Sequence, residues 1–250
     1  MTAFTYMLVS GIWLFGDQSS SDEEGLFIYC GAGMKKPMQN IGILFNHLFD
    51  IKITYNFAGS NTLLSQIQLY RRGDVYMPGA TYYIEQANNS GLILTSQLVA
   101  YHTPVIAVPQ GNPQGILDLV DLARSEVKVV FGDPNSCAIG KLGKQILEKN
   151  NLWNLVEPNI EAKAGTVNEL VLWISSGVGE ASIVWKSSLV GTEDKTDVVP
   201  IVEEKNIIKK IPIGLLTFSE KKQEALFFIV FVCSSIGKFI FQACGFDPYY

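Results

Sequence analysis

Basic residues are few in this 250-residue sequence, and none of them forms a long run. Lysine and arginine total 19 against 24 aspartates and glutamates, so the formal net charge is −5. The basic residues occur at most in pairs, as at Lys35-Lys36 and Arg71-Arg72. Binding to a nucleic acid depends on many cations that neutralise phosphates along one face. The composition therefore predicts that nucleic acid is not a partner.

Histidine is scarce as well, and the cysteines form no recognisable motif. His47 and His102 are the only histidines, and neither neighbours a plausible nucleophile in the sequence. The four cysteines are Cys30, Cys137, Cys233 and Cys244. They form no C-x-x-C pair, which excludes a zinc site or thioredoxin-like motif; apolar neighbours favour buried free thiols, with disulfide bridges as the alternative in an oxidising compartment. We expect no enzyme activity, no cofactor and no bare metal ion.

The sequence also lacks an apolar run long enough to span a bilayer. Residues 2–15 are mostly apolar and a polar run follows at 19–24, but no basic residue precedes them and no cleavage site is clear. We interpret residues 1–25 as a degenerate or truncated export signal with a linker, outside the folded part. This predicts a periplasmic or extracytoplasmic protein, whose N-terminal segment is either removed or retained as a membrane tether.

Strand patterns alternate with helical patterns from residue 26 onward. Strands are predicted at 26–30, 51–57, 74–78, 127–131, 160–164, 180–185 and 198–202. Helical spacing of apolar residues follows most of them, one long extended segment is predicted at 99–108, and two helices close the chain at 220–241. This alternation predicts an α/β fold with mixed, mostly parallel sheets flanked by helices. Ligands of such sheets bind beyond the carboxyl ends of strands, where helices begin.

The turn Ala58-Gly59-Ser60-Asn61 is a candidate binding site of this kind. It follows the predicted strand at 51–57 and precedes a helix whose apolar face carries Leu63, Ile67 and Tyr70. A helix N-terminus presents unpaired backbone N–H groups and the positive end of the helix dipole, and it is suited to bind an anion. The alternative is that Ser60 only caps its own helix.

Several segments, taken in order, resemble one known family. They are Ile28-Tyr29-Cys30-Gly31-Ala32-Gly33-Met34, Phe57-Ala58-Gly59-Ser60-Asn61-Thr62-Leu63, Gly73-Asp74-Val75, Gly132-Asp133-Pro134, Thr166-Val167, Ile183-Val184-Trp185 and Gly245-Phe246. The chain resembles a type II periplasmic substrate-binding protein, close to the molybdate/tungstate-binding component of ABC transporters. The resemblance implies two α/β lobes with a ligand cleft between them, joined by crossovers near residues 100–105 and 185–190. Lobe 1 would comprise 26–102 and 190–250, and lobe 2 would comprise 103–189.

The resemblance also implies where the ligand binds. The family's five ligand-contacting positions fall at Gly33, Ser60, Ile139, Val167 and Trp185. Two of them depart from the family pattern: Gly33 stands where the family has a serine, and Trp185 stands where it has a tyrosine. Asn61, Lys35 or Lys36 could supply a replacement for the lost donors, and the alternative for the two lysines is a solvated helix face.

We therefore expect a binding protein that captures a tetrahedral oxyanion, molybdate or tungstate, and delivers it as a monomer to ABC permease subunits. Three alternatives stay open from the sequence. One keeps the fold and binds a small organic anion, with Trp185 stacked on an apolar part of it. Another is a regulatory effector-binding domain of the same fold, although no helix-turn-helix segment accompanies it. An enzyme is the last, and no nucleophile–base pair supports it.

Overall fold

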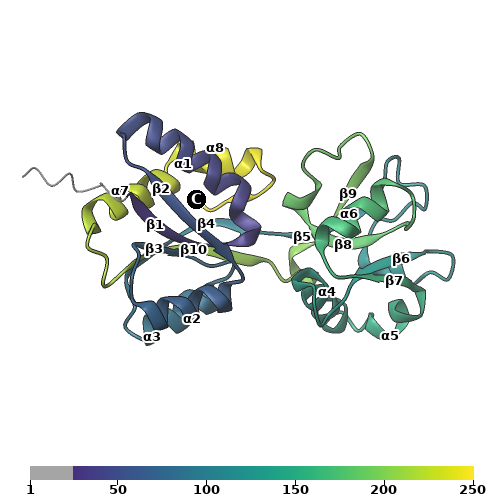
Figure 1. Ribbon diagram of the computed structural model, residues 1–250. Coiled ribbons are helices and arrows are strands. Elements are labelled where there is room, and N and C mark those ends of the chain that lie inside the picture. The colour runs from purple at the N-terminus through teal and green to yellow at the C-terminus, as the bar shows by residue number, and fades with distance from the viewer. Residues whose placement is uncertain (1–24) are drawn as a thin grey trace, which may run out of the picture.

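The computed structural model describes residues 25–250, which form two α/β lobes side by side (Figure 1). Residues 1–24, on which the predicted export signal falls, lie outside the described residues. The ribbon narrows between the lobes, where β4, β5 and β10 lie (Figure 1). The two-lobe α/β architecture expected from the sequence is confirmed.

Lobe 1 is built on a mixed six-stranded sheet. Its strands are β1 (Leu26–Gly31), β2 (Ile53–Ala58), β3 (Val75–Met77), β4 (Ile93–His102), β10 (Lys209–Leu216) and β11 (Asp247–Pro248). Their order in the sheet is β11-β4-β10-β3-β1-β2. The pairs β1·β2 and β1·β3 are parallel, whereas β10 runs antiparallel to both β3 and β4. Strand β10, which comes late in the chain, therefore lies at the centre of this sheet.

Helices cover both faces of the lobe 1 sheet because its strands are apolar on both sides. The helices are α1 (Lys35–Phe49), α2 (Ser60–Tyr70), α3 (Thr81–Asn89), α7 (Lys222–Cys233) and α8 (Ser235–Ala243). Ile28 and Cys30 of β1 belong to the core under α1, α7 and α8, and Tyr29 between them belongs to the core under α2 and α3. This alternation is the two-residue period of a strand. The carboxyl ends of β1 and β2 thereby lead into α1 and α2 on opposite faces of the sheet.

Lobe 2 has two small sheets around a single apolar core. The antiparallel sheet has the order β8 (Ser182–Trp185), β5 (Pro104–Pro109) and β9 (Thr196–Pro200), and the parallel pair is β6 (Val129–Gly132) with β7 (Ile160–Ala164). The helices of this lobe are α4 (Ala138–Lys149), α5 (Trp153–Val156) and α6 (Val167–Ser175). Gly140 allows α4 to lie directly on β6, since a Cβ there would come within 2.2 Å of the Gly132 carbonyl oxygen. The first turn of α4 is thereby fixed at the end of its strand.

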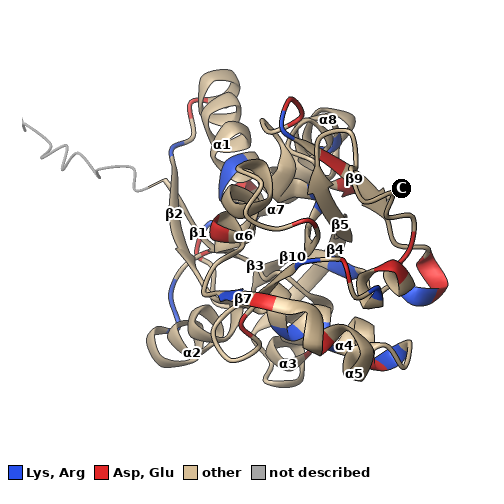
Figure 2. Ribbon diagram, turned by 90° about the vertical axis from the view of Figure 1, so that its right-hand side faces the viewer, with Lys and Arg blue, Asp and Glu red and all other residues tan. Residues whose placement is uncertain are grey.

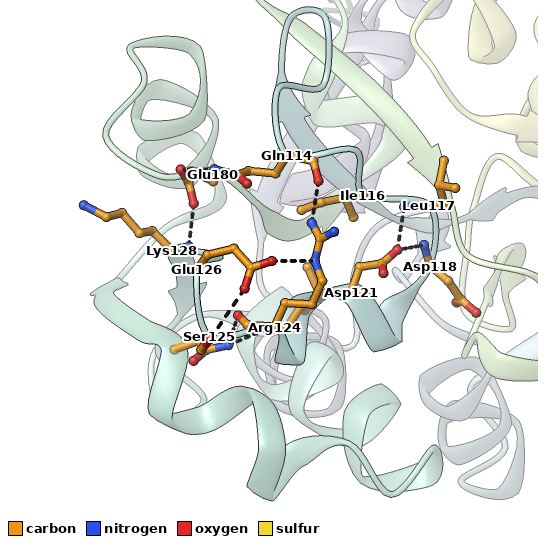
Figure 3. A network of polar contacts seen from close by, with 12 residues as sticks. Gln114, Ile116, Leu117, Asp118, Asp121, Arg124, Ser125, Glu126, Lys128 and Glu180 are labelled. Carbon is orange, nitrogen blue, oxygen red and sulfur yellow. Dashed lines mark hydrogen bonds and ion pairs between the residues drawn. The ribbon is translucent and has the colours of Figure 1, made fainter.

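Polar contacts hold the loop between β5 and β6 (Figure 3). Asp121 accepts backbone hydrogen bonds from Leu117 and Asp118 at 2.8 and 3.0 Å, at the start of the 3₁₀ helix η2 (Leu119–Ala123). Glu180 accepts from the Lys128 backbone at 2.8 Å and from the Gln114 side chain at 2.6 Å (Figure 3). These hydrogen bonds join the loop to Glu180, two residues before β8, and so help to fix the start of that strand.

The extended segment 99–108 holds two strands, β4 and β5, with the first connection between the lobes between them. Two details of the predicted architecture are wrong. Strand β9 pairs with β5, and Val199 and Ile201 lie in the lobe 2 core. Lobe 2 therefore continues past residue 190, and the chain returns to lobe 1 between β9 and β10, not at 185–190. Antiparallel strand pairs also outnumber parallel ones in the described part, because β4, β5 and β10 run antiparallel to each strand they pair with.

Residues 185–190 still contact lobe 1, through the 3₁₀ helix η4 (Lys186–Leu189). Asp247 accepts a hydrogen bond from the Lys186 ammonium at 2.5 Å and another from the Thr103 hydroxyl at 2.8 Å. A single carboxylate near the C-terminus thus bonds to both η4 and the first connection between the lobes.

The apolar helices and the cysteines bear on a membrane span and on disulfide bridges. No single helix among residues 25–250 has the length and hydropathy of a membrane span, while the pair α7 and α8, bent by 58°, meets the criterion only when taken together. The four cysteines are free thiols, and three of them are buried. The fourth, Cys233, is partly buried, and this burial raises the pKa of its thiol to about 11.

Candidate functional site

A cleft of about 1160 Å³ is lined by residues from both lobes. The N-terminal ends of several helices border it, and four of them carry the expected ligand positions: the joined η1 (Ala32–Met34) and α1, then α2, α4 and α6. The first two belong to lobe 1 and the last two to lobe 2. Each helix start carries backbone N–H groups without intrahelical acceptors. Four such starts around one cleft form a strong set of donors for an anion.

Ser60 lines this cleft and does not cap its helix. The N-cap of α2 is Gly59, and no side chain makes a capping hydrogen bond there. Instead, the Ser60 hydroxyl oxygen accepts from the Gly79 backbone N–H at 3.0 Å. Tyr76 donates to the Ser60 carbonyl at 2.8 Å, which fixes the turn. Since the oxygen is used as an acceptor, the hydroxyl proton remains available to a ligand.

Gly33 also lines the cleft, within η1 and two residues before α1, and it is exposed. A Cβ at this position would lie 3.4 Å from Cε1 of His102. The space beside Gly33 is therefore already bordered by an imidazole. Asn61, the neighbour of Ser60, is exposed in the same cleft and can direct its amide there.

The two positions in lobe 2 present their backbone. Ile139 is the second residue of α4, and its side chain is buried in the core, 1% exposed; its neighbour Ala138 lines the cleft. Val167 is the first residue of α6 and lines the cleft itself. Thr166 is the N-cap of α6: its hydroxyl accepts from the Glu169 N–H, whereas the Glu169 carboxylate accepts from the Gly165 N–H.

Trp185 lies at the end of β8, where the lobes meet, and stacks on a residue that the sequence gave no reason to single out. Its ring lies 3.7 Å from that of His102 between centroids, with an interplanar angle of 17°. His102 lines the cleft, is 8% exposed, and places Nε2 3.4 Å from the Ser187 hydroxyl. Burial lowers its pKa to about 3, so the imidazole is neutral at pH 7. Only spatial proximity, which the sequence hides, identifies this pair.

The charge of the cleft is of one sign. Its charged lining residues are Lys35, Lys36, Lys141 and Lys209, and no aspartate or glutamate is among the described residues that line it. The sequence pointed to the first two of these lysines, but not to Lys141 or Lys209. Elsewhere both signs mix, as along α4 (Figure 2). Between residues 25 and 250, no group of three or more His, Cys, Asp or Glu side chains is placed to hold a metal ion.

Known proteins with similar sequences include two curated relatives. A putative binding protein from Haemophilus influenzae is 27% identical over 223 residues, which cover 89% of this chain and 91% of the relative. The molybdate-binding protein ModA from Mycobacterium bovis is 22% identical over 250 residues, which cover 96% and 94%. The chain thus matches these relatives over almost their whole length.

Solved structures share the fold at low identity. The substrate-binding domain of a putative molybdenum ABC transporter from Clostridium difficile superposes with a TM-score of 0.81 at 22% identity, covering 90% of this chain and 99% of that one. PEB3 from Campylobacter jejuni, solved with L-phospholactate, gives a TM-score of 0.69 at 17% identity, covering 90% and 100%.

The resemblance drawn from the segments between Ile28 and Phe246 agrees with these comparisons. A family described as bacterial extracellular solute-binding proteins matches residues 26–247, almost all of the described chain. The fold described above is shared with the Clostridium difficile domain over 90% of this chain. This chain belongs to the bacterial extracellular solute-binding protein family.

Proposed function

We infer that the protein captures a tetrahedral oxyanion, molybdate or tungstate, between its lobes and delivers it to ABC permease subunits outside the cytoplasm. The observation that carries this inference is the convergence of four helix N-termini on a cleft lined by lysines and free of described carboxylates. Backbone N–H groups and hydroxyls bind a dianion through charge-assisted hydrogen bonds. The relatives named for molybdate add support from sequence and fold.

The proposed contacts come from Gly33, Ser60, Ile139, Val167 and Trp185. The first two would hold the anion from lobe 1, through the N–H at Gly33 and the hydroxyl at Ser60. The backbone N–H groups of Ile139 and Val167 would hold it from lobe 2, which couples binding to closure of the cleft. Trp185 would contribute its indole N–H at the junction, and Asn61 its amide.

Isothermal titration calorimetry of the full chain tests the ligand class. We expect tight, saturable binding of molybdate and tungstate, with weaker binding of sulfate and phosphate. Small-angle scattering of the same samples should show a smaller radius of gyration with molybdate, and light scattering should give a monomer. If none of the four anions gives heat on titration, the proposal that the cleft binds a tetrahedral oxyanion is wrong.

A second candidate ligand is a small organic anion, favoured by the aromatic residues in the cleft. Tyr82, Tyr83, Trp185 and Phe246 line it beside the lysines, so an apolar group could pack there while an anionic group meets the helix starts. PEB3, solved with L-phospholactate, shares the fold. Native mass spectrometry of the purified protein separates the two candidates, since a retained organic ligand has a mass of its own.

A further inference from the structure

The strongest unassigned feature of the cleft is the imidazole of His102. It is the last residue of β4, directly before the first connection between the lobes, so it can contact a ligand held by either of them. Two aromatic rings pack against it, Trp185 at 3.7 Å and Phe246 at 5.3 Å between ring centroids. A side chain held this firmly keeps one orientation toward the cleft, which is what a binding group requires.

The hydrogen bonding of the ring leaves it a donor. A neutral imidazole has one N–H and one acceptor nitrogen. Among the described residues, its single hydrogen-bond partner is the Ser187 hydroxyl, at 3.4 Å from Nε2, near the upper limit for such a bond. Burial keeps the ring uncharged at neutral pH. A weakly engaged polar group in a ligand cleft has capacity for a further, stronger bond.

The position of the ring coincides with the two sites that depart from the family pattern. At Gly33 the resemblance implies a serine hydroxyl, and the nearest side-chain atom to a Cβ built there is His102 Cε1. At Trp185 it implies a tyrosine hydroxyl, and the indole there is stacked on the same ring. One imidazole therefore stands between the two positions that lack the hydroxyl expected of them.

We propose that His102 is a ligand-contacting residue whose neutral imidazole donates its N–H to the bound anion, in place of the hydroxyls missing at Gly33 and Trp185. This rests on the proposed function, because it assumes an anion in the cleft. A neutral donor binds without adding a fifth positive charge to a cleft that already holds four lysines. His102 then also sets specificity, since its fixed ring limits the size of the anion on that side.

Two substitutions separate hydrogen bonding from packing. His102→Phe keeps an aromatic ring against Trp185 and removes the N–H, whereas His102→Gln restores an N–H donor without the ring. We expect the Kd for molybdate to rise about 10- to 100-fold in His102→Phe, the usual effect of losing a bond to a charged group. His102→Gln should recover a large part of that loss. His47→Phe, at the exposed histidine of α1, is the matched control and should bind like the parent.

The two proposals fail in different ways. A parent protein that binds neither molybdate nor tungstate overturns both. If the parent binds but His102→Phe binds equally well at an unchanged melting temperature, only the role of His102 is wrong. Should His102→Phe fold poorly, nitrogen-15 NMR of the parent decides: addition of molybdate must shift a ring-nitrogen resonance of His102, and unchanged resonances overturn the assignment.

Discussion

Replacement of Ser60 by alanine is the sharpest test of how lobe 1 binds its ligand. The hydroxyl oxygen accepts from the Gly79 N–H at 3.0 Å, which leaves its proton to point toward the cleft. A hydrogen bond from a hydroxyl to an anion contributes about 1.5–3 kcal/mol. Ser60→Ala should therefore raise the Kd for molybdate roughly 10- to 150-fold. No other hydroxyl stands at the five family positions, so a second serine cannot share this contact.

The same substitution should affect stability only slightly. Removal of the Oγ leaves the half-buried Gly79 N–H without its acceptor, which costs about 0.5–1.5 kcal/mol for an ordinary hydrogen bond. The start of α2 loses nothing, because Gly59 is the N-cap and alanine is a good helix former. Urea unfolding measures this term, and calorimetry measures the loss of affinity.

The control is Ser65→Ala, at an exposed serine in the same helix. It should leave both affinity and unfolding free energy unchanged, since surface substitutions of this kind are nearly neutral. If Ser60→Ala binds molybdate as tightly as the parent, the hydroxyl does not contact the anion. The anion would then be held by other groups of the cleft, such as the backbone N–H groups of the helix starts.

Three further predictions concern charge, pH and thiols. Lys141→Gln combined with Lys209→Gln should weaken anion binding severalfold at low ionic strength and flatten its salt dependence, as calorimetry at two salt concentrations can measure; an unchanged salt slope would contradict this. The pKa of His102 is lowered from 6.5 in the unfolded chain to about 3 in the folded protein, so between these pH values the unfolded state binds one more proton. As the pH falls below 6.5, the unfolding free energy of the parent should therefore decrease by about 1.4 kcal/mol per pH unit relative to that of His102→Phe. Burial raises the pKa of Cys30 and Cys244, so a thiol reagent should label them slowly in the native protein and fast in denaturant; equal rates in the two states would refute their burial.

Local chemistry determined which parts of the fold could be predicted. The turn at Ser60 is predicted from its own residues, because glycine, serine and apolar spacing mark such a boundary within a few residues, whereas Val167 and Ile139 are positions that the family resemblance implies. The structure brings all three to one cleft. This shared location is expected, because ligands of α/β sheets bind beyond the carboxyl ends of the strands, where helices begin. The assignment of the anion contact to each residue stays a prediction.

Long-range pairing determined what could not be predicted. Strand β9 has the same apolar pattern whichever lobe it joins, and only its pairing with β5 places it in lobe 2. In the sequence, His102 is only one residue of a predicted extended segment, because its contacts with Gly33, Trp185 and Ser187 come from two distant parts of the chain. Lys141 and Lys209 look like ordinary surface cations for the same reason.

The central position of β10 has a consequence for how this chain is made. Lobe 2 is complete once β9 has been synthesised, whereas the sheet of lobe 1 still lacks the strand that joins β4 to β3. As domains fold from the N-terminus during synthesis, the later lobe along the chain becomes the first to be finished. Until β10 arrives, β3 and β4 each expose an unpaired edge, which is where strands of separate molecules join. A chain truncated before β10 is therefore expected to have a folded lobe 2 and an incomplete lobe 1 sheet whose exposed edges favour aggregation.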